Sequence, residues 1–279
     1  LTLAEILRDD GYTNAAFVSA VPVTSRLNLD QGFHVFDDSL EAETNHVERR
    51  AGATTDAVVE WLRVNENEPF FLWVHYFDPH TPYRPPAGFR DMFFDTQDVS
   101  KRFMTPAAEF PGDALRTADA SRAGAATDTK LVEVNGRLFP LDVYVMNRKA
   151  LYAGEVAYMD SEVGRLISFF KDRGMYDSTM FVVVADHGET LGEKEHGEMF
   201  RHNTVFEEVA RVPLVVKLPG GGSPVSSHVP VCTLDIAPTL LAVSGSRLPP
   251  GVSFDGISLL DAAQGKNAPP TGAARPVFF

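Results

Sequence analysis

The strongest constraint in this sequence is a repeated local pattern, in which an amphipathic helix is followed by a short strand that is apolar on both faces. A helix is predicted to begin at Thr2, which can form a capping box with Glu5, and residues 15–19 then form a buried strand. Residues 55–64 predict a second helix, and the apolar strand 70–74 follows it. Strands of this kind are covered on both faces only inside a mostly parallel sheet.

The same pattern returns in the second half of the chain. Apolar residues recur at spacings of three and four over residues 152–170, which predicts an amphipathic helix that ends at Gly174. Residues 181–184 form another strand that is apolar on both faces, and residues 214–217 form a further strand. This alternation predicts an α/β fold with a mostly parallel, doubly wound sheet and helices on both faces.

Between about residues 95 and 141 the pattern breaks down. Residues 117–129 are rich in Ala, Thr, Ser and Asp and have no apolar periodicity. We expect an irregular insertion that leaves the sheet, with a short hairpin around Asn135 and Gly136. No internal repeat is visible. We expect residues 1–279 to belong to one domain that carries this insertion.

Composition disfavours several classes of protein. The 38 acidic and 25 basic side chains give a formal net charge of −13, which disfavours nucleic-acid binding because no basic face is available to neutralise phosphates. The longest apolar runs, 70–74 and 180–185, are too short to span a bilayer. The one cysteine, Cys232, allows no intramolecular disulfide and no multi-cysteine metal cluster, and its apolar neighbours Val231 and Leu234 predict a buried core thiol.

Polar residues gather where two of the predicted strands end. The first doubly apolar strand is followed by His75 and His80, and the second by Asp186 and His187. In open α/β sheets, ligands bind outside the carboxyl ends of the strands. Most of the eight histidines lie in these two stretches of the chain: His75, His80, His187, His196 and His202. This concentration indicates a functional site.

Each of these residues has a functional and a structural interpretation. Asp186 and His187 offer a carboxylate and an imidazole, which suits half of a divalent-metal site; alternatively, Asp186 caps the next turn and His187 is a solvated loop residue. His80 lies between two prolines, which restrict its backbone and hold the ring in place. The ring is then either positioned for catalysis or is that of a turn histidine packed against Tyr83. A nearby charged run is expected to be a solvated loop rather than an acid–base pair: Glu193, Lys194 and Glu195.

Short segments over nearly the whole chain follow the order of motifs in a known enzyme family. These segments are residues 2–17, 29–38, 70–83, 152–164, 185–189, 206–214 and 235–240. Their joint order resembles that of the sulfatase family of the alkaline-phosphatase-like superfamily. The resemblance implies an alkaline-phosphatase-like α/β fold and the hydrolysis of sulfuric esters.

The resemblance also implies a metal site and a sulfate pocket. Asp186 and His187 would bind the single divalent cation, which is Ca²⁺ in most of the family, with Mn²⁺ or Zn²⁺ as alternatives. His80 would lie in the sulfate pocket and assist the ester or its leaving oxygen. His75 belongs to the same segment and would contact the substrate.

The resemblance places a pocket cation near residue 202. His202 falls where many relatives have a lysine, and the neighbouring Arg201 is the alternative occupant of that position. A histidine there would make the charge beside the leaving oxygen depend on pH, because imidazole titrates near neutrality.

The family's nucleophile is missing from the sequence. It is a formylglycine made from the Cys or Ser of a Cys/Ser-x-Pro-x-Arg motif, and no such motif occurs here. Cys232 lacks the proline and arginine, and residues 21–26 have the wrong spacing. The paired aspartates that begin the family's metal site are also missing, and residues 275–279 resemble a strand cut off in mid-course. We therefore expect a partial catalytic domain, truncated at both ends and inactive alone toward aryl sulfates.

Three functions stay open at this point. The first is the hydrolysis of a small-molecule or glycan sulfate ester, with a divalent cation and an upstream formylglycine. The second is the hydrolysis of a phosphate or phosphonate monoester, and the third is a non-catalytic binding module. The presence of His80, Asp186 and His187 favours the first. Relatives are often exported, so the resemblance favours a periplasmic or extracellular protein; the sequence defines neither the ester nor the oligomeric state.

Overall fold

The computed structural model describes residues 1–43, 46–93, 116–118, 131–134, 137–193, 200–224, 226 and 230–266. The helices of this part of the chain are α1 (Leu3–Asp9), α2 (Ala51–Asn65), α3 (Ala87–Arg90), α4 (Leu141–Asp172), α5 (Glu207–Ala210), α6 (Ile236–Ser244) and α7 (Leu260–Ala263). Its strands are β1 (Thr13–Phe17), β2 (Val35–Asp37), β3 (Glu41–Glu43), β4 (His46–Glu48), β5 (Phe70–Val74), β6 (Arg116–Ala118), β7 (Leu131–Val134), β8 (Arg137–Pro140), β9 (Phe181–Val184) and β10 (Leu214–Lys217). No helix in these ranges is both long and apolar enough to cross a membrane.

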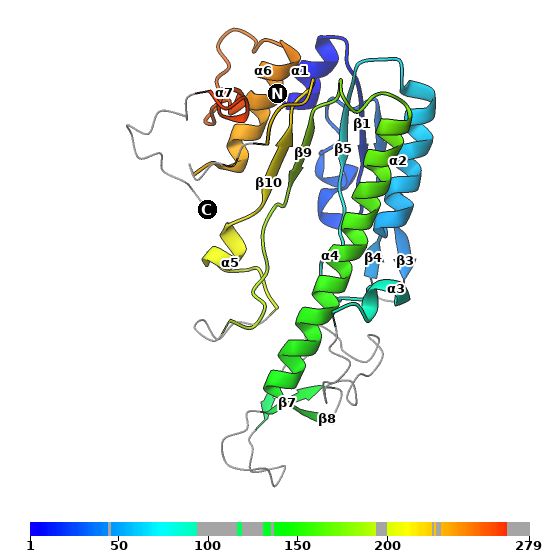
Figure 1. Cartoon of the computed structure of the whole chain (residues 1–279), viewed down its shortest axis with the longest axis vertical. Helices are drawn as coiled ribbons and strands as arrows, with labels where there is room; N and C mark the ends of the chain where they lie inside the picture. Colours follow the sequence, from blue (N-terminus) through cyan, green and yellow to red (C-terminus); the bar gives the residue numbers. More distant parts are fainter. Residues whose placement is uncertain are drawn as a thin grey trace.

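The predicted α/β fold with a parallel sheet is confirmed. Strand β1 lies between β2 and β5 and pairs with both in parallel, with Ala15 opposite Val35 on one side and Leu72 on the other. In Figure 1, α2 and α4 run side by side along this sheet. Strand β1 comes two residues earlier than expected, because residues 18 and 19 already belong to the loop that leaves the sheet.

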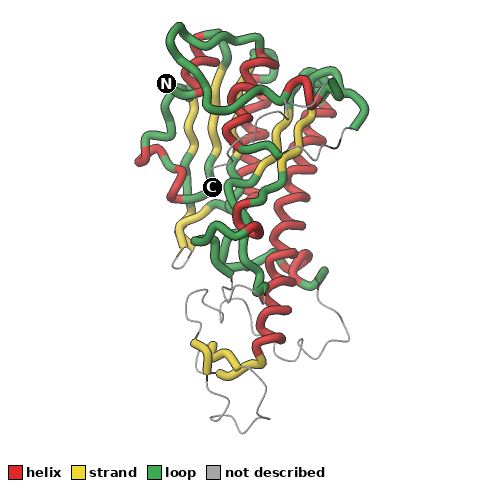
Figure 2. Tube along the Cα trace, turned by 90° about the vertical axis from the view of Figure 1, so that its left-hand side faces the viewer, coloured by secondary structure: helices red, strands yellow, loops and turns green. Residues whose placement is uncertain are grey.

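Both faces of the parallel sheet are covered by helices, as β5 shows. Phe70 and Leu72 pack into a cluster with α2 and α4, whereas Phe71, on the other face, packs with α1 and α6. Figure 2 shows helices on the two sides of the strands. Strand β5 is therefore apolar on both faces because helices cover both of them, as the sequence pattern predicted.

Strand β9 differs from the prediction in its pairing and its burial. It pairs with β10 in antiparallel fashion, with Val183 opposite Val215, and the two strands form a sheet of their own within the described part of the chain. Val183 and Val184 are 43% and 38% exposed. The doubly buried strand expected here is wrong, because in the described residues β9 has a strand neighbour on one side alone.

Helix α4 begins well before the predicted start. It runs from Leu141 rather than from about residue 152, and its first turns bury Tyr144 and Leu151 against Phe139 and Phe200. Apolar periodicity is weaker in these first turns, because they also bury two polar side chains, Asn147 and Arg148. The helix ends before Gly174, whose φ of +67° lies in the left-handed region, as predicted.

The hairpin expected around residues 135 and 136 is present as β7 and β8, which pair in antiparallel fashion with Val134 opposite Arg137. Its two turn residues lie outside the described part of the chain, as do Glu195, His196 and residues 275–279. In Figure 1 this hairpin lies at the N-terminal end of α4. Val132 and Phe139 of the hairpin pack with Tyr83, so the described part of the insertion reaches the loop that carries His80.

The N-terminal capping box is confirmed, whereas the prediction for Cys232 is wrong. The Glu5 backbone N–H donates to Thr2 Oγ1 at 3.1 Å, and the Thr2 backbone N donates to Glu5 Oε2 at 2.6 Å. Cys232 is half-buried rather than part of the core, because it is the N-cap of a 3₁₀ turn, Thr233–Asp235. Its backbone N–H donates to Asp235 Oδ2 at 3.0 Å.

Candidate functional site

Three of the predicted histidines meet at the carboxyl ends of β5 and β9. The rings of His80 and His202 have centroids 5.3 Å apart, and those of His187 and His202 are stacked with centroids 4.3 Å apart. His80 follows β5, His187 follows β9, and His202 precedes α5. These residues are distant in the sequence and come together at the strand ends, where the sequence analysis expects a site.

Asp186 and His187 present two donor atoms to the same region. The Nδ1 of His187 lies 2.8 Å from the Gly188 carbonyl oxygen; a carbonyl only accepts, so Nδ1 carries the proton and Nε2 keeps its lone pair. This Nε2 lies 3.7 Å from Asp186 Oδ2, and the Asp186 side chain is 79% exposed. The pair therefore offers one nitrogen and one oxygen ligand at the protein surface.

Gly188 allows the loop that holds this pair to pack closely on α5. Its backbone N–H donates to the Val209 carbonyl oxygen at 2.7 Å, and a Cβ built at Gly188 would collide with the Glu208 carbonyl oxygen. Glycine is thus required at this position by close approach of the backbone rather than by its dihedral angles. The loop's position, and with it that of His187, follows from this contact.

These two donors fit a divalent cation as part of a site. Carboxylate oxygen and neutral imidazole nitrogen are donors that divalent metals accept in proteins. Across the described ranges, no group of three or more His, Cys, Asp or Glu side chains could hold a metal ion. Further ligands would have to come from other groups.

His80 is fixed by its neighbours in a half-buried position. Its ring stacks on Phe77 with centroids 4.3 Å apart. Its Nδ1 lies 2.7 Å from the Thr81 carbonyl oxygen and so donates to it, which leaves Nε2 as the acceptor of the neutral ring. Burial lowers the pKa of His80, although the hydrogen bond to Thr81 opposes this shift.

His202 and Arg201 lie on a segment that Thr190 holds. The backbone N–H of Thr190 donates to the Arg201 carbonyl oxygen at 3.0 Å, and the Arg201 N–H donates to Thr190 Oγ1 at 3.0 Å. His202 Nδ1 lies 3.8 Å from Glu189 Oε1, a buried carboxylate. The Arg201 side chain is exposed beside the same hollow as His80 and His202.

His75 lies at the end of β5, next to the cluster rather than in the hollow. Its Nδ1 accepts a hydrogen bond from the Ser19 backbone N–H at 3.3 Å, and its carbonyl accepts from Ser19 Oγ. Burial lowers the pKa of His75, and the negative charge of Asp186 opposes this shift.

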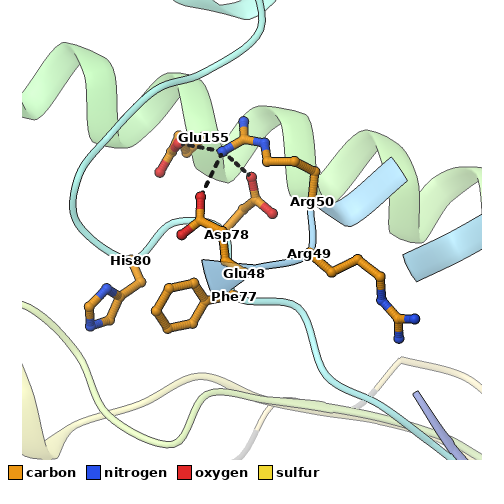
Figure 3. A pocket seen from close by; sticks show the side chains of 7 residues that line it. All are labelled: Glu48, Arg49, Arg50, Phe77, Asp78, His80 and Glu155. Carbon is orange, nitrogen blue, oxygen red and sulfur yellow. Dashed lines mark hydrogen bonds and ion pairs between the residues drawn. The ribbon is translucent and has the colours of Figure 1, made fainter. Parts of the chain in front are cut away.

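Sequence reasoning missed a buried ionic network behind His80. Figure 3 shows the guanidinium of Arg50 between three carboxylates, with His80 and Phe77 beside them. Arg50 Nη1 lies 3.1 Å from Asp78 Oδ1, 3.3 Å from Glu155 Oε1 and 4.0 Å from Glu48 Oε1. The network connects the start of α2, the middle of α4 and the loop of His80.

The carboxylates of this network titrate abnormally. Burial raises the pKa of Glu155 to about 8. Hydrogen bonds from Arg84 and Arg50 favour the charged carboxylate and so oppose this shift. Burial also raises the pKa of Asp78, and the charge of Arg50 opposes that shift. The Asp78 carboxylate in addition accepts a hydrogen bond from the Ala51 backbone N–H at 2.9 Å, which holds the His80 loop against α2.

A second group that the sequence analysis missed supports the other side of the loop. Tyr83 donates to Glu189 Oε2 at 3.1 Å, and the Arg148 guanidinium lies 4.1 Å from the centre of the Tyr83 ring. Arg148 Nη2 also donates to Thr81 Oγ1 at 3.0 Å. The structural alternative placed His80 against Tyr83, but the ring on which His80 stacks is that of Phe77.

A family model described as Sulfatase matches residues 1–246 of the chain. An arylsulfatase of Clostridium perfringens is 28% identical over 215 residues, which are 75% of this chain and 41% of that protein. A choline-sulfatase of Rhizobium meliloti is 30% identical over 207 residues, which are 73% of this chain and 38% of that protein.

The fold is also found in solved structures. A phosphonate monoester hydrolase of Silicibacter pomeroyi matches with a TM-score of 0.63 at 24% identity, over 98% of this chain and 63% of the other. The chain spans about two fifths of the length of the curated relatives described above. The family match covers most of the residues and includes every residue of the histidine cluster, so the chain belongs to the sulfatase family.

Proposed function

We propose that this chain is part of the catalytic domain of a hydrolase of sulfuric esters. The observation that carries the proposal is the meeting of His80, His187 and His202 beside a hollow of about 530 Å³. Names of the relatives, an arylsulfatase and a choline-sulfatase, support sulfate esters as the substrate class.

In this proposal the imidazoles and Arg201 act on the sulfate group and the leaving oxygen. His80 keeps its Nδ1 proton on the Thr81 carbonyl, so its Nε2 is the atom that takes up a proton and delivers it to the leaving oxygen. His202, and Arg201 beside it, offset the negative charge that develops there. His75 orients the substrate from the Asp186 side.

Asp186 and His187 are proposed to hold one divalent cation, Ca²⁺ in the first instance and Mn²⁺ or Zn²⁺ as alternatives. A bound cation would supply electrostatic stabilisation of the ester oxygens. The 279 residues contain no Cys/Ser-x-Pro-x-Arg motif, so the proposed formylglycine nucleophile is assigned to sequence outside them. Activity is therefore expected of the longer protein and not of this chain alone.

The test compares three esters with the longer protein: 4-nitrophenyl sulfate, 4-nitrophenyl phosphate and phenyl methylphosphonate. We expect the sulfate to be turned over fastest, with activity lost in Asp186→Ala and His80→Ala. Faster turnover of the phosphate or the phosphonate would replace the proposal with the second function. Turnover of none of them, together with no saturable binding of Ca²⁺, would replace it with the non-catalytic module.

A further inference from the structure

We propose that Arg148 is a positioning residue: its buried guanidinium joins the loop of His80 to the segment of His202 and so fixes how the two imidazoles face each other. The inference rests on the proposed function, in which both rings act on one ester. Arg148 belongs to α4 and is 2% exposed, outside the lining of the hollow. It therefore acts through its neighbours rather than by contact with the ester.

The guanidinium of Arg148 contacts two aromatic rings that come from different segments. Its central carbon is 4.1 Å from the centre of the Tyr83 ring, in the loop after β5, and 5.1 Å from the centre of the Phe200 ring. Phe200 is two residues before His202. The two rings also meet edge to face, with centroids 6.2 Å apart. A planar guanidinium stacks on aromatic faces, so Arg148 packs the two segments against each other.

Phe200 carries this contact to the backbone of the His202 segment. Its φ of +54° lies in the left-handed region, which a bulky residue adopts only where its surroundings hold it there. Phe200 is 5% exposed, its ring packs edge to face on Tyr144, and its backbone N–H donates to the Thr190 carbonyl oxygen at 2.6 Å. The direction in which the chain enters His202 depends on this conformation.

A hydrogen bond carries the same restraint to His80. Arg148 Nη2 donates to Thr81 Oγ1 at 3.0 Å, and the Thr81 carbonyl oxygen accepts from His80 Nδ1 at 2.7 Å. The residue that fixes the tautomer of His80 is thus itself held by Arg148. In the proposed reaction Nε2 of His80 takes up and delivers the proton, which requires that Nδ1 keep its own.

The burial of Arg148 is costly for the stability of the fold. This arginine forms no ion pair within the part of the chain that the structure describes, and its Nε has no hydrogen-bond partner there. Burial of an unpaired charge costs free energy, which an apolar side chain of similar length would avoid. Such a cost, at a residue that contacts both pocket segments, favours a functional role over a purely structural one.

Histidine NMR on the 279-residue chain tests the positioning directly. Proton–nitrogen correlation spectra distinguish the two tautomers of a neutral imidazole, and the signals of His80 are those missing from His80→Gln. In Arg148→Met, we expect the share of the Nε2–H tautomer of His80 to rise by at least about twofold. The nuclear Overhauser contact between the rings of His80 and His202, whose centroids are 5.3 Å apart, should weaken. Lys149→Met removes an exposed cation from the next position of α4 and should change neither signal.

Arg148→Lys separates the shape of the guanidinium from its charge. Lysine stays positive but has no planar group to stack on two rings. In the longer protein we expect kcat for 4-nitrophenyl sulfate to fall by about tenfold or more in Arg148→Met, and Arg148→Lys to stay within about threefold of that variant. Lys149→Met should keep kcat within about twofold of the unaltered enzyme. Full recovery in Arg148→Lys would show that charge alone is needed and would overturn the inference.

Thr81→Val is a milder variant that tests the same restraint. It keeps the shape of the side chain and removes the oxygen that accepts from Arg148 Nη2. The tautomer of His80 should shift in the same direction by a smaller amount, and the substitution should add nothing in Arg148→Met, because the bond is already lost there. Circular dichroism establishes which variants are folded. Unchanged His80 signals in every folded variant of Arg148 and Thr81 would contradict the inference.

The two proposals fail in different ways. If the longer protein turns over no sulfate ester but Arg148→Met shifts the His80 tautomer and weakens the ring contact, the proposed function fails and the positioning role stands. If the sulfate is turned over and Arg148→Met changes neither these signals nor kcat, the positioning role fails and the proposed function stands.

Discussion

The imidazole rings of His187 and His202 are stacked, with centroids 4.3 Å apart and planes 22° from parallel. His187 belongs to the loop after β9 and His202 to the segment before α5, so this contact joins the proposed metal ligand to the proposed pocket cation. A change at one ring is therefore expected to affect the position of the other.

Removing the carboxylate next to His187 should weaken metal binding. Asp186→Ala leaves a single nitrogen donor, and we expect the affinity for Ca²⁺ to fall by more than about tenfold, because Ca²⁺ prefers oxygen ligands. Calorimetric titration measures the change. Asp160→Ala, at an exposed position of α4, is the control and should bind Ca²⁺ as the unaltered chain does. Equal affinities in the two variants would remove Asp186 from the metal site.

Glu155→Gln should change how stability depends on pH. The folded-state pKa of Glu155 is about 8, above its ordinary value of 4.5, so the folded state holds this proton over a range in which the unfolded state has lost it. The contribution of Glu155 to stability is thus present below pH 4.5 and is lost as the pH rises to about 8.

Glutamine keeps an oxygen that can accept from Arg84 and Arg50 but does not titrate. The free energy of unfolding of Glu155→Gln, relative to the unaltered chain, should therefore increase steadily between pH 4.5 and 8. Urea denaturation at a series of pH values measures it. A difference that stays constant over this interval would show that Glu155 has no raised pKa.

Removing Arg50 should be far more damaging than removing an exposed arginine. At neutral pH Glu155 largely keeps its proton, so Arg50→Ala leaves the buried Asp78 carboxylate without its cation, and we expect a loss of about 3–5 kcal/mol in the free energy of unfolding. Arg165→Ala is the comparison: this arginine also pairs with two carboxylates, Asp56 and Glu162, but its side chain is exposed. Its loss should be about 0–1 kcal/mol. Similar losses in both variants would show that burial does not distinguish the two networks.

Two glycine-to-alanine substitutions should have opposite signs. Gly188→Ala places a Cβ against the Glu208 carbonyl oxygen, so we expect a loss of about 1–3 kcal/mol and weaker Ca²⁺ binding as the loop of His187 moves. Gly164→Ala, in α4 with open space around the new Cβ, should stabilise the protein by about 0.5–1 kcal/mol. Thermal unfolding and calorimetry measure both. If Gly188→Ala keeps full stability and metal affinity, the close packing of this loop on α5 is not needed for the site.

Local sequence patterns predicted the elements that depend on nearby residues. The capping box of Thr2 and Glu5 and the strand Phe70–Val74 follow from side chains a few positions apart, and both are present. The exposure of Val183 could not be predicted in this way, because the sequence of an apolar strand does not show whether one or two other strands pair with it.

The same distinction between local and long-range determinants applies to the residues of the site. The histidines could be found because they follow apolar strands, and strand ends of an α/β sheet meet by topology. Arg50 and Glu155 are 105 positions apart and meet only because α2 packs on α4. Glu155 lies in one of the segments that carry the family resemblance, but nothing in that segment pairs it with Arg50, so the ionic network behind His80 required the three-dimensional structure.

The bonds around Thr190 have a consequence for the position of His202. The Phe200 backbone N–H donates to the Thr190 carbonyl at 2.6 Å, and Thr190 also bonds Arg201 through both its backbone and its hydroxyl. The two ends of the intervening stretch are therefore fastened to each other. The position of His202 relative to the loop of His187 is thus set by the bonds of Thr190 itself.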